Sequence, residues 1–218
     1  LAMGHVILRE FHLDRQAAYF EDYVRKYSDM PMLVRLEERD GRLVPARQVR
    51  AADFDAALGE ANNPEWKTVA IDETSGQIVV PNGSIGFRWG EQGKWNLEEK
   101  AQGRDVKLRL SLIEDGAHDD IAGVDFPYFG GQATENFVKC QHPDVLTKNV
   151  PVKRVQLADG EALVCTVFDL ICAHYGLDRG LGGEWVAADY DADIPYTPAW
   201  AEKKIGRASC RERVCHRV

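Results

Sequence analysis

Apolar positions near the start of the chain repeat at the spacing of an α-helix. Five of them form one stripe, which predicts a helix over the first turns. Its members are Met3, Val6, Ile7, Leu8 and Phe11. Because no Ser, Thr, Asp or Asn precedes the stripe to cap its amides, we interpret residue 1 as lying inside a helix whose first turns are missing. A second helix is expected over residues 14–27, with Asp14 as its N-cap and the tyrosines at 19, 23 and 27 on one side.

Residues 32–165 change to the alternation and the glycine turns of β-structure. Hairpins are predicted where two strand-like runs flank a turn. The expected pairs are 32–38 with 42–48 around Asp40-Gly41, 66–72 with 77–80 around Ser75-Gly76, and 152–157 with 161–165 around Asp159-Gly160. Further strands are expected over 84–89 and over 104–112, where Val106, Leu108, Leu110 and Leu112 share one face. The middle of the chain is therefore predicted to be β-rich.

The pattern becomes helical again after residue 165. Thr166 and Asp169 have the spacing of a capping box, with Asp in place of the usual Glu or Gln, and they predict a helix over 167–175 that ends at Gly176. Residues 176–183 are glycine-rich and irregular, and Thr197-Pro198 begins another helix. We therefore expect an α+β arrangement with helical flanks at 1–31 and 166–204 around a β-rich block at 32–165. Such an order suggests an insertion into a larger α/β domain.

Composition narrows the class of protein. The chain has 218 residues, 44% of them hydrophobic, and a formal net charge of −8, which is typical of a folded globular protein that does not bind nucleic acid. No run approaches the roughly 20 apolar residues of a membrane span, and no basic-then-apolar start indicates a signal peptide. Five cysteines in a chain of this length do not form a disulfide scaffold.

The end of the chain differs in character from the rest. Residues 205–218 carry four Arg, one Glu and two of the cysteines. The run looks like a sequencing adapter translated in one frame, so we interpret it as a tail that is not native and exclude it from the fold. A basic tail with a functional partner is the alternative. Three cysteines then remain, Cys140, Cys165 and Cys172.

Three acidic residues, Asp189, Asp191 and Asp193, have the alternating spacing of a calcium-binding loop. Such a loop needs Gly at its sixth position and Glu at its twelfth. This chain has Ile194 and Trp200 at those places. The spacing therefore favours a solvated acidic turn over a calcium site.

The other chemical motifs also have structural interpretations. The cysteines, with His142 and His174 nearby, lack the paired Cys spacing of zinc sites, so Cys165 and Cys172 are expected to be buried small hydrophobic residues. The glycines of 176–183 follow a helix, whereas a dinucleotide-binding loop follows a strand. No P-loop and no nucleophile elbow occur. His5 and His12 lie near a helical face without an evident partner.

Long runs of the chain resemble one family closely. The strongest is PNGSIGFRWG at residues 81–90, followed by GKWNL at 93–97. Others are residues 9–14, 29–34, 36–41, 50–53, 62–70, 126–131, 151–154 and 196–202. Over residues 1–204 the chain resembles an internal piece of the catalytic alpha subunit of respiratory membrane-bound nitrate reductases. It departs from the family pattern at 99–123, 132–148 and 183–193, as surface loops do.

This resemblance implies a large α/β molybdopterin oxidoreductase that reduces nitrate to nitrite. Its implied cofactors are bis-molybdopterin guanine dinucleotide with molybdenum and a 4Fe-4S cluster. Its implied partners are an iron–sulfur beta subunit and a membrane gamma subunit, which would place it at the cytoplasmic face of the membrane as a peripheral protein. The family's cluster ligands, its molybdenum aspartate and its Gly-Thr-Asp pterin loop have no counterpart in this sequence. We therefore predict no catalytic, cofactor-binding or metal-ligating residue here, and a fragment that is inactive by itself.

Within the family, the resemblance implies that the helical flanks help to cradle one pterin. The β-rich block would lie at the rim, along the substrate approach or against a partner subunit. Arg88 and Arg50 are the candidates for steering an anion such as nitrate, although pairing with nearby carboxylates is the simpler expectation. Trp89 is expected to be buried and to anchor the block. A chlorate, perchlorate or selenate reductase, or an independent β-rich interaction module, are the alternatives.

Overall fold

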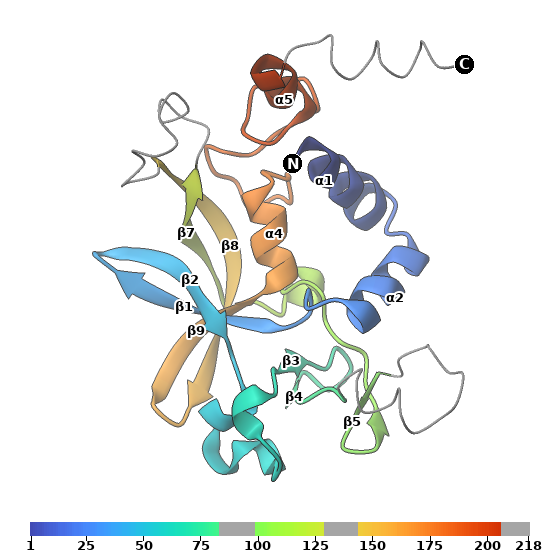
Figure 1. Cartoon of the computed structure of the whole chain (residues 1–218), viewed down its shortest axis with the longest axis vertical. Coiled ribbons are helices and arrows are strands. Elements are labelled where there is room, and N and C mark those ends of the chain that lie inside the picture. The colour runs from blue at the N-terminus through green and yellow to red at the C-terminus, as the bar shows by residue number, and fades with distance from the viewer. Residues whose placement is uncertain (83–98, 129–143, 206–218) are drawn as a thin grey trace.

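The computed structural model describes residues 1–82, 99–128 and 144–205. Figure 1 shows a curled sheet with helices beside it and a group of short strands and turns at one end. Helices come first along the chain, strands follow, and helices return at the end. The mixed α+β order predicted from the hydrophobic pattern is therefore confirmed. The predicted strand over 84–89 lies outside the described residues.

The main sheet has five strands in the order β2-β1-β9-β8-β7, and each neighbouring pair is antiparallel. The strands are β1 (Leu33–Arg39), β2 (Arg42–Gln48), β7 (Asp120–Tyr128), β8 (Asp144–Leu157) and β9 (Gly160–Thr166). Strand β8 pairs with β7 through residues 144–152 and with β9 through residues 153–157. The sheet curls around this change of partner, and Arg42 Nη1 on β2 donates to Asp125 Oδ2 on β7 at 3.3 Å. The two edge strands therefore approach each other.

Two hairpins form where the turn residues predicted them. Asp40 (φ 53°) and Gly41 (φ 73°) join β1 to β2, both in the left-handed region that a two-residue hairpin turn requires. Arg39 consequently faces Arg42 across the turn. Strands β8 and β9 pair from Leu157 and Gly160 onward. The hairpin around Ser75-Gly76 also forms, but its strands are much shorter than expected.

The short strands are β3 (Ala70–Ile71), β4 (Ile78–Val79), β5 (Lys100–Ala101) and β6 (Arg104–Asp105). The predicted strand over 104–112 is therefore wrong in its length, because only Arg104–Asp105 form a strand and Leu108 adds an isolated antiparallel bridge to Asp72. Leu108, Leu110 and Leu112 are buried as their alternation indicated, but Arg109 and Ser111 on the opposite side are buried as well. The segment is covered on both sides because its leucines pack into apolar clusters while Arg109 and Ser111 bind the Glu114 carbonyl and Asp169.

The helices are α1 (Ala2–Leu8), a π-helical segment η1 (Arg9–Asp14), α2 (Ala18–Tyr27), α4 (Val167–His174) and α5 (Pro198–Ile205). Single 3₁₀ turns occur at η2 (Ala51–Asp53), η3 (Asp55–Gly59), η4 (Pro64–Trp66) and η5 (Glu114–Gly116). The prediction that Asp14 caps the second helix is wrong, because Asp14 ends η1 and Ala17 is the N-cap of α2. Thr166 caps α4 as predicted, and its Oγ1 accepts from the Asp169 amide at 3.0 Å.

The predicted apolar stripe of the first helix is also wrong in its orientation. His5, Leu8 and His12 face inward, whereas Met3 is 77% exposed and Ile7 is 46% exposed. The inward residues follow the i, i+3, i+7 spacing of one helical face just as the apolar residues do. Two histidines that lie outside the predicted stripe therefore share the buried face with Leu8.

Three apolar clusters lie among the described residues, a small one at Ala70, Val79, Ala101 and Leu108 and two larger cores that organise the sheet and the helices. The larger core fills the inside of the curled sheet. Helix α4 packs against β8 and β9 and covers this core. Its fully enclosed members include Leu33, Val49, Val69, Leu112, Val124, Val150 and Val164. The smaller core joins α1, α2 and α4 through Leu8, Val24, Leu110, Phe168, Cys172 and Leu177. Leu110 lies in the smaller core and Leu112 in the larger one, so the 104–112 segment passes from one core to the other.

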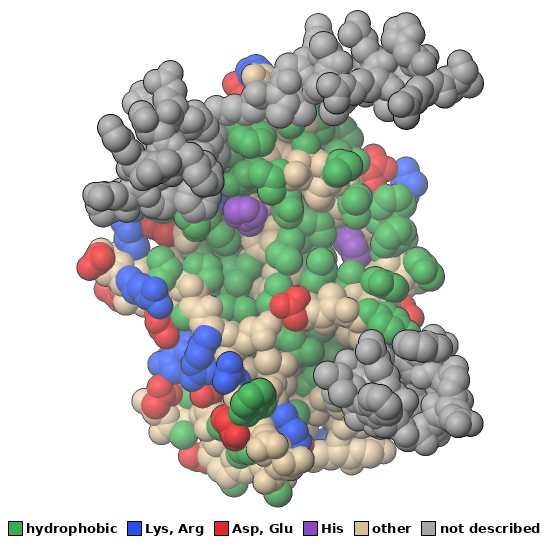
Figure 2. All heavy atoms as spheres, viewed as in Figure 1, with side chains coloured by type: hydrophobic (Ala, Val, Ile, Leu, Met, Phe, Trp, Pro, Cys, Tyr) green, Lys and Arg blue, Asp and Glu red, His purple; other side chains and the backbone are tan. Residues whose placement is uncertain are grey.

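Apolar side chains also lie on the surface of the two N-terminal helices. Figure 2 shows hydrophobic side chains spread over the face on which α1 and α2 lie. The exposed large apolar residues are Leu1 at the N-cap of α1, Met3 and Ile7 on α1, and Tyr19, Tyr23 and Tyr27 on α2. The rings of Tyr19 and Tyr23 are 6.4 Å apart and those of Tyr23 and Tyr27 are 5.0 Å apart, so the α2 residues form a continuous ladder. We call this set of six residues the helical apolar face.

Candidate functional site

The residues that sequence reasoning selected lie in separate places. Arg50 is exposed, and its Nη1 donates to the Glu65 carbonyl at 2.6 Å, which holds the 50–66 loop together. The Arg50 guanidinium thus binds a carbonyl oxygen and not the carboxylate that was the simpler expectation. Arg88, Trp89, Cys140 and His142 lie outside the described residues. The anion-steering role of the arginines therefore stays a prediction.

The acidic turn predicted at 189–193 is confirmed. Asp189 Oδ1 accepts from the amides of Asp191 and Ala192, at 3.0 and 2.8 Å. Asp193 points to Lys203, with Oδ2 and Nζ 2.6 Å apart. The carboxylates thus serve a local turn and a surface ion pair.

Cys165 and Cys172 are fully buried, as their apolar surroundings predicted. Burial raises the pKa of the Cys172 thiol to about 12 and raises that of Cys165 well above its ordinary value. A nucleophilic or metal-binding cysteine needs the thiolate form. These two thiols therefore remain protonated and act as packing groups.

The helices α1, η1, α2 and α4 form what we call the helical layer. It contains three histidines, His5, His12 and His174. His5 has a partner that the sequence did not reveal, because its Nδ1 lies 2.8 Å from the Tyr175 carbonyl and donates to it. Burial lowers the pKa of all three imidazoles. They are therefore neutral at physiological pH and pack with neighbouring rings, such as Phe168 beside His12 and Tyr196 beside His174.

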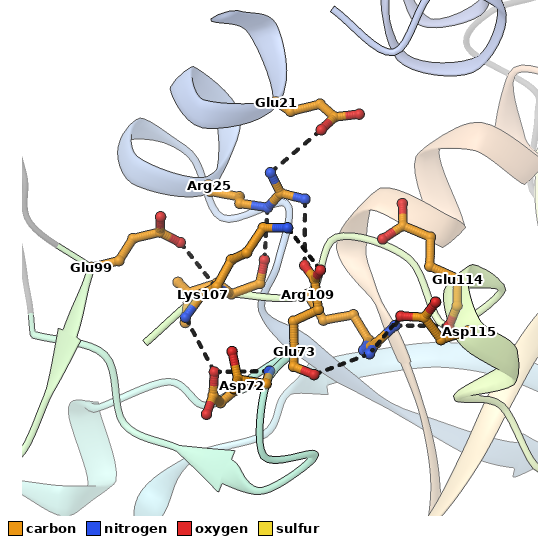
Figure 3. Close-up of polar contacts among 11 residues, drawn as sticks. Glu21, Arg25, Asp72, Glu73, Glu99, Lys107, Arg109, Glu114 and Asp115 are labelled. Carbon is orange, nitrogen blue, oxygen red and sulfur yellow. Dashed lines mark hydrogen bonds and ion pairs between the residues drawn. The ribbon is translucent and has the colours of Figure 1, made fainter. Parts of the chain in front are cut away.

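A cluster of charged side chains joins α2 to the 72–76 turn and the 104–116 segment (Figure 3). Arg25, only 8% exposed, donates from Nε to the Leu108 carbonyl at 2.8 Å and pairs with Glu73 at 3.7 Å. Glu73 also pairs with Lys107 at 2.7 Å. Arg109 donates from Nη1 to the Glu114 carbonyl at 2.7 Å. Opposite charges and carbonyl dipoles thus compensate the two buried guanidinium groups, although Arg109 Nε has no hydrogen-bond partner among the described residues.

Asp72 completes this charged cluster from the turn. Burial would raise the pKa of Asp72, but hydrogen bonds from Ser75, Lys107 and Thr74 outweigh it, and the pKa lies below its usual value. A carboxylate saturated with donors is a poor general base. Sequence reasoning missed the cluster because Arg25 and Arg109 have the pattern of solvent-facing positions. Its arrangement fits a structural clamp between helix and turn.

A second polar centre lies at the start of α4. Asp169, with no exposed surface, accepts from Ser111 Oγ at 2.8 Å, the Leu112 amide at 2.9 Å, Thr166 Oγ1 at 2.9 Å and Arg179 Nη2 at 2.6 Å. The two oxygens each receive two donors. We call residues 176–183 the glycine loop. The Asp169–Arg179 centre connects the N-terminus of α4 to the 104–112 segment and to this loop.

The described residues contain no group of three His, Cys, Asp or Glu side chains that could hold a metal ion. An iron–sulfur cluster needs several such ligands in one place, and this part of the chain does not bring them together. In the same part of the chain, no helix is both long and apolar enough to span a bilayer.

Comparison with known proteins gives the chain a family context. No family model matches it. It is similar to the respiratory nitrate reductase 1 alpha chain of Escherichia coli (strain K12), with 60% identity over 209 residues that cover 94% of this chain and 16% of that protein. The respiratory nitrate reductase 2 alpha chain of the same strain is 57% identical over 208 residues, again 94% of this chain and 16% of that protein. The nitrate reductase alpha chain of Bacillus subtilis (strain 168) is 36% identical with the same two coverages.

These relatives are oxidoreductase subunits, and the similarity covers nearly all of the present chain. The chain corresponds to one segment of the nitrate reductase alpha chain and spans 16% of the length of the relatives named above. The resemblance found in the sequence is thereby confirmed.

Proposed function

We propose that this chain is a structural, non-catalytic part of the alpha subunit of a molybdenum-dependent respiratory nitrate reductase. The observation that supports it is 60% identity over 94% of the chain. In that subunit, molybdenum held by two pterin guanine dinucleotides would reduce nitrate to nitrite, with electrons arriving through a 4Fe-4S cluster. The described residues bring no set of cluster ligands together, and we assign no chemical step to them.

Within this proposal, residues 1–31 and 166–204 belong to the α/β domain that cradles a pterin, and residues 32–165 form a β-rich insertion at its rim. The helical apolar face supports this division, because six exposed apolar side chains on α1 and α2 suit burial against further protein. The curled sheet has its own filled core and suits a peripheral position.

We further propose the partners and location that this role entails. An iron–sulfur beta subunit and a membrane gamma subunit would complete the enzyme at the cytoplasmic face of the membrane. The word "alpha" in the relatives' names indicates an assembly of several subunits. Nitrate is the proposed substrate of the whole enzyme.

A segment exchange tests this function. The matching segment of the Escherichia coli nitrate reductase 1 alpha chain is replaced by residues 1–204 of this chain, and nitrate reduction with a reduced dye is measured in membranes. We expect activity close to that of the unmodified enzyme per molybdenum bound. A matched chimera with Asp169→Asn should assemble in smaller amounts but with the same activity per molybdenum. An assembled chimera that binds molybdenum and does not reduce nitrate would refute the proposal.

A further inference from the structure

A small, mostly enclosed cavity lies where β8, the end of α4 and the glycine loop meet. It is lined by Lys148, Gly176, Arg179, Gly183 and Trp185, among others, and it has room for about one water-sized group. The glycines matter for its shape. A side chain at Gly176 would meet the Trp185 carbonyl at 2.9 Å, and Gly183 has a φ of 114°, which disfavours other residues. The loop is thus built to keep this space open.

Two buried cations form part of the wall. The whole Lys148 residue is 3% exposed, and the Arg179 side chain is 6% exposed. Lys148 Nζ donates to the His174 carbonyl at 2.7 Å and lies 5.6 Å from the Tyr196 ring centre. Among the described residues no carboxylate pairs with it. A buried ammonium without a counter-charge is costly, so this site favours a negative group beside it.

Arg179 adds a second buried donor group without an acceptor among the described residues. Its Nη2 is bound by Ser111 and Asp169, but its Nη1 is buried without an acceptor in the described part of the chain. Asp169 cancels one of the two positive charges, and Lys148 remains in excess. A water molecule could accept both N–H groups but would leave the charge uncompensated. An anion would satisfy the donors and the charge together.

We propose that this cavity binds one small inorganic anion of halide size, held between Lys148 Nζ and Arg179 Nη1. The ligand class follows from the volume, which excludes large organic anions, and from the excess positive charge. The site goes beyond the function proposed above and does not depend on it.

The titration of the lysine provides a signature for this site. Burial lowers the pKa of Lys148 to about 8, so the empty site loses its charge as the pH rises through that value. The other titratable and charged groups around it are His5, His174, Arg179 with its partner Asp169, and Tyr196. Both histidines have a lowered pKa and are neutral near pH 8, and Arg179 remains charged. Anion affinity should therefore fall above about pH 8 because of Lys148.

The test uses the purified 218-residue chain and chloride as the probe. The line width of the chloride-35 resonance is measured near pH 7 and as the pH is raised, with bromide as competitor. We expect a broadening that bromide reverses and that declines as the pH passes about 8. Lys148→Met should abolish it. Lys153→Met on the same strand should retain it, because Lys153 already pairs with Asp119 at 3.8 Å.

A second measurement covers the case in which Lys148→Met does not fold. Unfolding of the unmodified chain is compared in sodium chloride and sodium gluconate at equal ionic strength. Above the dissociation constant, each tenfold rise in chloride should lower the unfolding equilibrium constant about tenfold, and gluconate should have no such effect. Equal stability in the two salts would overturn the proposal. So would a chloride signal that persists in Lys148→Met or does not change with pH.

Discussion

Replacing Asp169 with Asn tests the centre that joins α4 to both cores. The side chain keeps its shape, but one oxygen becomes an NH₂ group that faces two donors, and Arg179 loses the carboxylate that lies 2.6 Å away. Since Asp169 is fully enclosed and the Arg179 side chain is 6% exposed, the cation stays buried without compensation. Breaking a buried ion pair in this way costs about 3–5 kcal/mol. For a chain of this size the melting temperature should fall by about 10 °C.

The assay is urea unfolding followed by circular dichroism and tryptophan fluorescence. Asp159→Asn is the matched control, because the Arg35–Asp159 pair has a similar distance of 2.7 Å but Asp159 is 60% exposed. That control should change the free energy of unfolding by less than about 1 kcal/mol. The double variant Asp169→Asn with Arg179→Met should lose less than the sum of the single losses, because it removes both charges. A loss below about 1 kcal/mol for Asp169→Asn, or strict additivity, would refute this reasoning.

Three further predictions concern the same layer. Gly176→Ala should lower the melting temperature clearly more than Gly180→Ala does. Both glycines have a positive φ, but only Gly176 has a backbone oxygen 2.9 Å from the added carbon. Equal melting temperatures of the two variants would contradict this. Stability should fall as the pH drops below about 6.5, since the three histidines of the helical layer have lowered pKa values and the unfolded state binds more protons there. A melting temperature that stays level down to about pH 5 would show that they do not contribute. Cys165 and Cys172 should react with a thiol reagent only after urea unfolding, and rapid labelling of either of these two residues in the native chain, located by peptide mapping, would show that this core opens.

Local signals predicted the hairpins and α4 because their causes lie within a few residues. Asp40-Gly41 specifies a two-residue turn, and Thr166 finds its capping partner three positions later. Strand β7 was not predicted, and its sequence contains Gly123 and Pro127, two residue types that are depleted in strands. Its pairing with β8 comes from tertiary contact, which overrides weak propensity.

The polar centres could not be predicted for a similar reason. Arg25 meets the Leu108 carbonyl across 83 positions of sequence, and Ser111 meets Asp169 across 58. A pattern of spacing within one element contains no information about such partners. The burial of His5 is another case, since only the Tyr175 carbonyl, 170 positions away, explains it.

The order of strands in the sheet has a consequence for synthesis on the ribosome. Strand β9 is central, and it pairs with β1, which is made much earlier. Cys165 and Val34 are neighbours in that pairing and lie 131 positions apart. At roughly 5–20 residues per second, Val34 of the β1–β2 hairpin is made about 7–26 s before its partner Cys165. During that interval the apolar side chains of β1 that later pack in the sheet core stay exposed. A chaperone that binds them therefore protects the chain most while residues 49–160 are being translated.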